Sequence, residues 1–209
     1  ELENIQKSVI NNSNSILMIG YNRRFAPLIL KMKSLINNIS SPISMVMTVN
    51  AGYIPKDHWI QDINIGGGRI IGELCHFIDL LRYFGDSNIS DYKYLFMDST
   101  TNDTVTLQLK FNNGSIGVIN YFSNGSKLLP KERLEIFFEG KVLQLDNYKT
   151  LKGYGITGFN KIKKYYQDKG QEHCVKEFIE AIKNGLSPPI PYDEIFEVSK
   201  ITLDIASSK

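Results

Sequence analysis

The spacing of apolar positions predicts helices at both ends of the chain. They are an opening helix that carries Leu2, Ile5, Val9 and Ile10, and helices over 27–36, 172–184 and 192–207. Pro27 suits a first helical turn, and Gly185 suits the position after a last one. We expect the apolar faces of the last two helices to pack against the body of the protein.

In the middle of the chain the pattern changes to strict alternation, which is typical of strands with one buried face. A strand is expected over 44–51, and alternating strands over 92–98, 104–111, 115–122, 133–140 and 142–146. Asn112-Asn113-Gly114 and Glu139-Gly140-Lys141 have the composition of hairpin turns. Residues 147–167 are expected to form a loop with short strands. The sequence therefore predicts an open, largely antiparallel sheet that helices cover on one face, which is an α+β fold.

The run Ser15–Gly20 is continuously apolar, as in strands that are buried on both faces of a parallel sheet. A helix followed by such a strand is typical of the end of a doubly wound, Rossmann-type domain. The chain also opens at Glu1, without Met, inside that helix. We therefore expect residues 1–20 to be the tail end of a dinucleotide-binding domain that is mostly absent, and residues 21–209 to form a second, C-terminal domain.

A turn of three glycines, Gly66–Gly68, leads into a helix that ends near Gly85. At about 100° per residue, its apolar residues share one side, while Glu73 and His76 lie on the other at i, i+3 spacing. A carboxylate beside an imidazole suits proton transfer to a small molecule. The alternative is an ordinary amphipathic helix with a solvated face.

Composition narrows the classes of function. The 209 residues carry a net charge of +2 with scattered lysines, which does not favour nucleic acid, and no apolar run approaches a membrane span. Two cysteines, Cys75 and Cys174, are too few for a disulfide framework, which favours the reducing cytoplasm. Each adjoins a histidine, but the spaced ligand pairs of zinc sites are missing, so no metal is expected.

Several motifs, in order, resemble the C-terminal part of the Gfo/Idh/MocA family of NAD(P)-dependent oxidoreductases. They are Ile19–Pro27, Asp57-His58-Trp59, Gly66–Asp79, Phe178–Gly185 and the proline-rich linker over 187–191. The stretches Asn50–Gly52, His58-Trp59 and Gly72–His76 most resemble a bi-domain branch of this family, which is fused behind an alcohol-dehydrogenase-like domain in sugar and polysaccharide gene sets. The resemblance implies the substrate-binding and oligomerisation domain of a dehydrogenase that acts on a sugar, a sugar nucleotide or a polyol.

The resemblance also implies roles for individual residues. His76 stands at the position of the family's general acid/base, and Glu73 is expected to orient it, because Gly72 occupies the place where many members carry an aspartate. NAD or NADP would be bound mainly by the missing N-terminal domain, since the chain contains no G-x-G-x-x-G. The open sheet face is expected to bind further copies in a homo-oligomer.

The remaining candidates lie near the expected crevice. Substrate contacts are expected from Tyr21, Asn22, Arg23, Trp59 and Gly72, and a cofactor contact from Arg24. Each has a structural alternative, since one arginine can form an internal ion pair and Trp59 can fill the core beneath its loop.

Two other functions stay open at this point. One is a non-catalytic binding or assembly module that uses the same sheet and needs neither His76 nor Glu73. The other is an isomerase or lyase for sugars that uses NAD transiently. Under the dehydrogenase hypothesis the chain alone is expected to be inactive.

Overall fold

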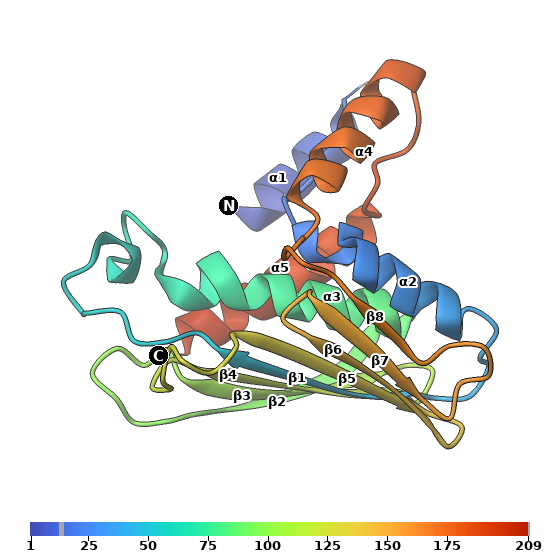
Figure 1. Cartoon of the computed structure of the whole chain (residues 1–209). Helices are drawn as coiled ribbons and strands as arrows, with labels where there is room; N and C mark the ends of the chain where they lie inside the picture. The colour runs from blue at the N-terminus through green and yellow to red at the C-terminus, as the bar shows by residue number, and fades with distance from the viewer. Residues whose placement is uncertain (13–14, 209) are drawn as a thin grey trace.

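The computed structural model describes residues 1–12 and 15–208, which form one eight-stranded sheet with helices on one side (Figure 1). The strands are β1 (Ser44–Asn50), β2 (Ile89–Phe96), β3 (Val105–Phe111), β4 (Ile116–Phe122), β5 (Glu132–Phe138), β6 (Lys141–Asp146), β7 (Thr150–Tyr154) and β8 (Lys161–Lys163). The α-helices are α1 (Leu2–Asn11), α2 (Pro27–Ile36), α3 (Cys75–Gly85), α4 (Gln171–Asn184) and α5 (Tyr192–Ser207). Short helical turns are η1 (Asn22–Phe25), η2 (Trp59–Gln61) and η3 (Ile70–Leu74).

The sheet has the order β2-β3-β4-β1-β5-β6-β7-β8. At its centre, Val46 of β1 pairs with Val118 of β4 in parallel and with Glu135 of β5 in antiparallel orientation. Every other neighbouring pair is antiparallel. The predicted open, largely antiparallel sheet is therefore confirmed.

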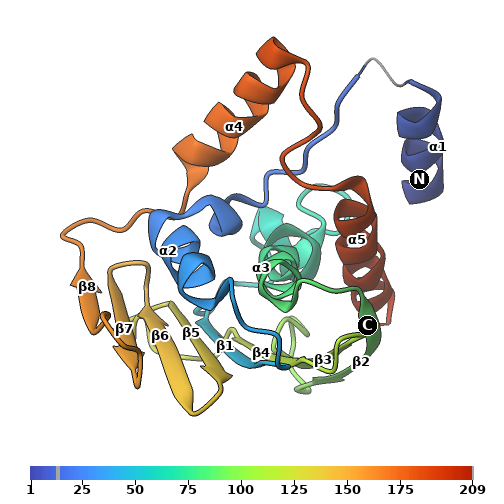
Figure 2. The ribbon, with the colours of Figure 1, turned by 90° about the vertical axis from the view of Figure 1, so that its right-hand side faces the viewer.

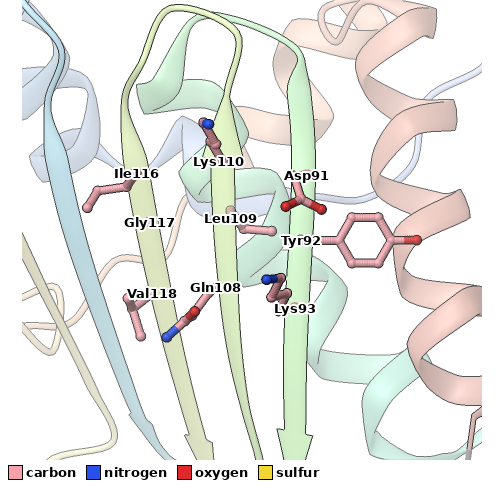
Figure 3. Close-up of a pocket in the computed structure, with 9 residues that line it drawn as sticks. All are labelled: Asp91, Tyr92, Lys93, Gln108, Leu109, Lys110, Ile116, Gly117 and Val118. Carbon is pink, nitrogen blue, oxygen red and sulfur yellow. The ribbon is translucent and has the colours of Figure 1, made fainter.

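Along each strand, alternate side chains point toward the helices or toward the open face of the sheet. Met45, Met47 and Val49 of β1 are buried beneath the helices, and the inward positions of the neighbouring strands are buried with them. Figure 2 shows α2, α3 and α5 on this side of the sheet. The opposite face has no helix among the described residues, and its side chains, such as Lys93 and Gln108, line a shallow pocket over β2, β3 and β4 (Figure 3).

Local sequence signals explain several boundaries. Pro27 starts α2, since its fixed φ suits a first turn and its missing N–H costs no hydrogen bond there. Glu139 and Gly140 both have positive φ (45° and 71°) and form the two-residue turn between β5 and β6. The predicted Gly185 ends α4 with φ of 61°. Within 147–167, β7 and β8 are the expected short strands.

Two predictions about elements are wrong. Ser15–Gly20 forms no strand, because an extended segment becomes a strand only by pairing, and no described strand lies beside it. The apolar face of α4 is not packed either: Val175, Ile179 and Ile182 are 61%, 42% and 53% exposed. The helix projects away from the sheet, beyond the layer of α2, α3 and α5 (Figure 1). For α5 the prediction is correct, since Ile195, Val198, Ile201 and Ile205 are buried.

None of the described helices is long and apolar enough to cross a membrane.

Candidate functional site

The glycine turn feeds a π-helical segment rather than a regular α-helix. Gly67 and Gly68 have φ of 70° and 77°, which suits glycine. Residues Ile70–Leu74 then form the π-helix η3, and α3 continues from Cys75. Because π-helical hydrogen bonds span five residues instead of four, side chains rotate around the axis differently from those of an α-helix. Such segments are frequent at functional sites.

His76 lies in the first turn of α3 and is partly buried. Its Nδ1 atom is enclosed and has no hydrogen-bond partner among the described residues. The ring of Tyr21 meets the imidazole edge-on, with centroids 5.9 Å apart. Burial, reinforced by the positive charge of Arg23, lowers the pKa of His76 to about 4. The imidazole is therefore neutral at neutral pH.

Among the described residues, no hydrogen bond or ion pair joins Glu73 to His76, so the predicted carboxylate–imidazole pair is not formed. Its Oε2 accepts hydrogen bonds from Tyr121 Oη and, at 3.1 Å, from Arg69, while Oε1 pairs with Lys131. These bonds outweigh burial and lower the pKa of Glu73 to about 2. The prediction failed because Glu73 lies within the π-helix and because its partners come from β4 and from the residue before β5.

A second ion-pair cluster also acts on His76. Arg23 donates to both carboxylate oxygens of Glu132, at 2.9 and 3.2 Å, and Lys169 Nζ lies 2.6 Å from Oε1. The guanidinium of Arg23 also stacks over Phe77, with 4.4 Å between its Cζ atom and the ring centroid. The charges of Arg23, Lys169, Glu132 and Glu73 all act on the imidazole. His76 thus has an Arg–Glu–Lys cluster and a Glu73 cluster as its charged neighbours.

Arg24 lies in the interior, where it forms ion pairs with two carboxylates. It reaches Asp79 at 2.5 and 3.0 Å and Glu194 at 2.8 Å, and its side chain is almost fully buried. These bonds tie η1 to α3 and α5. The arrangement favours a structural role for Arg24 over the predicted cofactor contact.

The structure brings some of the other candidates to His76 and leaves others apart. Tyr21 contacts the imidazole, and Asn22 donates from Nδ2 to the carbonyl of Lys169 at 2.7 Å. Arg23 donates both of its described hydrogen bonds to Glu132, within the ion-pair cluster that acts on His76. Trp59 is exposed on η2 beside His58, and no described contact joins it to the imidazole. Gly72 is exposed, with room for a Cβ atom.

Several polar and charged groups of the site were missed by sequence analysis: Arg69, Tyr121, Lys131, Glu132 and Lys169. Glu132 carried a usable signal, since it takes an inward position in the alternation of β5, where Leu134 and Ile136 are buried. A carboxylate at such a position requires a buried partner. Tyr121 likewise takes a buried inward position in β4, but nothing local identifies its partner. Arg69, Lys131 and Lys169 lie in loops or at the start of a helix, where periodicity gives no signal.

The site contains neither a metal centre nor a dinucleotide cradle. The described residues include no group of three or more His, Cys, Asp or Glu side chains that could hold a metal ion. Arg24 is occupied by Asp79 and Glu194, and the turn Gly66–Gly68 lacks the spacing that phosphate-binding turns need. The described residues therefore do not themselves fit a dinucleotide.

Comparison with solved structures identifies the fold. The UDP-N-acetylglucosamine 3-dehydrogenase GnnA from Acidithiobacillus ferrooxidans superposes with a TM-score of 0.78 at 18% identity, over 99% of this chain and 65% of its own. For the dehydrogenase MviM from Clostridium difficile, the TM-score is 0.74 and the identity 20%, over 97% of this chain and 65% of the MviM chain. For the aldose-aldose oxidoreductase from Caulobacter crescentus, the TM-score is 0.77 and the identity 15%, over 98% of this chain and 64% of that enzyme's chain. No protein-family model and no curated protein matches the sequence.

These neighbours are oxidoreductases of the Gfo/Idh/MocA type, so the fold that the sequence resemblance predicted is confirmed. This chain spans about 65% of the length of the first of them. The identities are low, and the likeness is one of fold.

Proposed function

We propose that this chain, which has the fold of the C-terminal part of Gfo/Idh/MocA oxidoreductases, is the substrate-binding and catalytic domain of an NAD(P)-dependent dehydrogenase that acts on a CH–OH group. The observation that carries the proposal is the state of His76, a partly exposed imidazole that is neutral at neutral pH. A neutral imidazole accepts a proton, which is what a substrate hydroxyl must lose as it is oxidised.

The chain's own part in the reaction is proton transfer and substrate orientation. When bound, a nicotinamide would accept the hydride from the carbon that carries the hydroxyl. His76 would take the hydroxyl proton on Nε2, a contribution of about 100- to 10,000-fold to the rate. Glu73 would act indirectly, by fixing Lys131 beside the site.

The polar groups around His76 suit a polyhydroxylated substrate. Lys131 and Lys169 are each held by a carboxylate while keeping 37% and 19% of their side chains exposed. Both can donate hydrogen bonds to hydroxyl or phosphate oxygens. A sugar, a sugar nucleotide or a polyol fits this donor set, and Trp59 is a candidate to stack on a sugar ring if its loop closes over the site. The neighbour names that mention UDP-N-acetylglucosamine and aldoses support the sugar class.

We assign the dinucleotide, NAD or NADP, to a partner domain of the Rossmann type. The absence of a cradle among the described residues supports this assignment, as does the exposed apolar face of α4. Residues 1–20 are then the tail of that domain, and 21–209 the C-terminal domain. Under this proposal the chain alone is inactive, and it works in the cytoplasm, where nicotinamide coenzymes are available.

The open sheet face is proposed to bind a second copy of the chain. Ile116, Phe137 and Tyr154 are about half exposed on this face. Ile116 and Phe137 flank Ser44 in register, and Val142 lies between Phe137 and Tyr154. This row crosses five strands and carries apolar side chains on four of them, a surface that a second sheet can cover.

The test is coenzyme reduction by the full-length protein, with NAD⁺ and NADP⁺, over a panel of sugars, sugar nucleotides and polyols. We expect His76→Gln to lower kcat at least 100-fold while leaving the fold intact. His173→Gln, at an exposed position on α4, is the matched control and should retain full activity. Wild-type rates in His76→Gln would remove the base from the mechanism. A protein that is inactive over the whole panel would favour a non-catalytic assembly module, and a product isomer without net reduction would favour an isomerase.

A further inference from the structure

The connection between β8 and α4 passes unusually close to η1. Gly170 has φ of 81°, and a Cβ atom there would lie 2.5 Å from the carbonyl oxygen of Asn22 and 2.5 Å from the amide nitrogen of Ala26. Asp168 Oδ1 accepts a hydrogen bond from the amide of Gly170 at 2.8 Å, and Asn22 holds the carbonyl of Lys169 at 2.7 Å. The backbone of Lys169 is therefore fixed on both sides.

The side chain of Lys169 is fixed as well. Its Nζ lies 2.6 Å from Glu132 Oε1, beside His76. Arg23 already donates to both oxygens of Glu132, so the carboxylate does not need a second cation to be neutralised. Glu132, Arg23 and Lys169 together leave one surplus positive charge next to the imidazole.

We propose that Lys169 is a positioning residue of the His76 site: the β8–α4 connection holds its ammonium group on Glu132, where its charge adds to burial and to Arg23 in favouring the form of the imidazole that accepts a proton. Only the predicted effect of Lys169 on catalysis rests on the proposed function. The electrostatic part concerns the chain by itself and can be measured without a substrate.

The sign of the effect follows from the charges that face the imidazole. Arg23 from η1 and Lys169 from the β8–α4 connection favour the neutral ring, whereas Glu132 from β5 and Glu73 from η3 favour the protonated ring. Removing the charge of Lys169 also leaves Glu132 less neutralised. Both changes favour protonation, so the pKa of His76 must rise.

Nuclear magnetic resonance titration of the histidine ring protons measures this directly, because the chain has only three histidines. In Lys169→Gln, which keeps an N–H donor for Glu132, we expect the His76 midpoint to move up on the order of half a pH unit or more. Lys169→Arg should restore the wild-type midpoint. Lys176→Gln, on the exposed side of α4, is the matched control and should change nothing.

An unchanged His76 midpoint in folded Lys169→Gln would overturn the proposal, and so would an equal shift in Lys176→Gln. If Lys169→Gln does not fold, Lys169→Met provides the same test without the amide. In the active full-length protein, Lys169→Gln should move the acidic limb of the kcat/KM profile to higher pH in parallel with the measured midpoint. A shift in the titration without any activity would separate this proposal from the proposed function.

Discussion

At the scale of single residues, the site separates two titratable groups that lie three positions apart. Glu73 is held in its charged form by Lys131, Tyr121 and Arg69, and its pKa falls to about 2. His76 is held in its neutral form, mainly by burial, and its pKa falls to about 4. One helical segment therefore presents a fixed carboxylate and a free base, a division of roles that is common in sites for acid–base chemistry.

The lowered pKa of His76 predicts a dependence of stability on pH. Between the ordinary pKa of 6.5 and the folded value of about 4, the unfolded chain binds more protons than the folded one. The contribution of His76 to the free energy of unfolding should thus be fully present above about pH 6.5. It should decline by on the order of 2 kcal/mol as the pH falls toward 4. Urea unfolding at pH 7 and pH 4.5 measures the decline.

In His76→Gln the decline between these two pH values should shrink by about that amount. His173→Gln serves as the control and should keep the wild-type dependence. Equal declines in wild type and His76→Gln would show that the imidazole is not buried in the neutral form.

The residue scale also shows where sequence reasoning reached its limit. His76 was identifiable, because its motif has a recognisable order and an i, i+3 carboxylate. The partners of Glu73 were not, because Tyr121 and Lys131 lie 48 and 58 residues away in the sequence. Local spacing predicts a contact only when no distant group competes for the same side chain. Here three did.

At the scale of elements, one glycine joins two parts of the site. Gly170 lies against the backbone of η1, at distances that only a residue without Cβ tolerates. Gly185, at the other end of α4, also has positive φ, but open space surrounds its Cβ position. A substitution at Gly185 therefore measures backbone strain alone, whereas one at Gly170 measures backbone strain together with steric overlap.

We predict that Gly170→Ala destabilises the protein by at least 2 kcal/mol more than Gly185→Ala. The second change costs only the strain of a left-handed residue, about 1 kcal/mol, while the first adds backbone overlap. Chemical unfolding of both variants measures the difference. Equal losses would show that the β8–α4 connection can move away from η1, and would weaken the role given to Lys169.

The elements were more predictable than their surroundings. Prolines at 27 and 191 mark the starts of α2 and α5, and both helices match their predicted bounds. Ser15–Gly20 and α4 were misjudged for a shared reason. Both carry apolar patterns that require a partner surface, and a pattern indicates burial without identifying what covers it.

At the scale of the whole molecule, the open sheet face carries the prediction for assembly. Phe137→Glu places a charge in the centre of the apolar row that includes Ile116 and Tyr154. If a second copy covers this face, the variant should be monomeric at concentrations where the wild type is dimeric or larger. Light scattering after size exclusion measures the mass.

Leu128→Glu, at a fully exposed loop position, is the control for this experiment and should leave the assembly unchanged. A monomeric wild type would refute the proposed interface, as would a Phe137→Glu variant that keeps the wild-type mass.

In the proposed reaction, His76 takes a proton from a hydroxyl whose carbon gives up hydride. The most direct measurement follows deuterium from the carbinol carbon of an accepted substrate into the coenzyme of the full-length protein. We predict one deuterium per reduced nicotinamide, and a transfer rate at least 100-fold lower in His76→Gln. Reduced coenzyme without deuterium, or transfer at the wild-type rate in His76→Gln, would contradict the account.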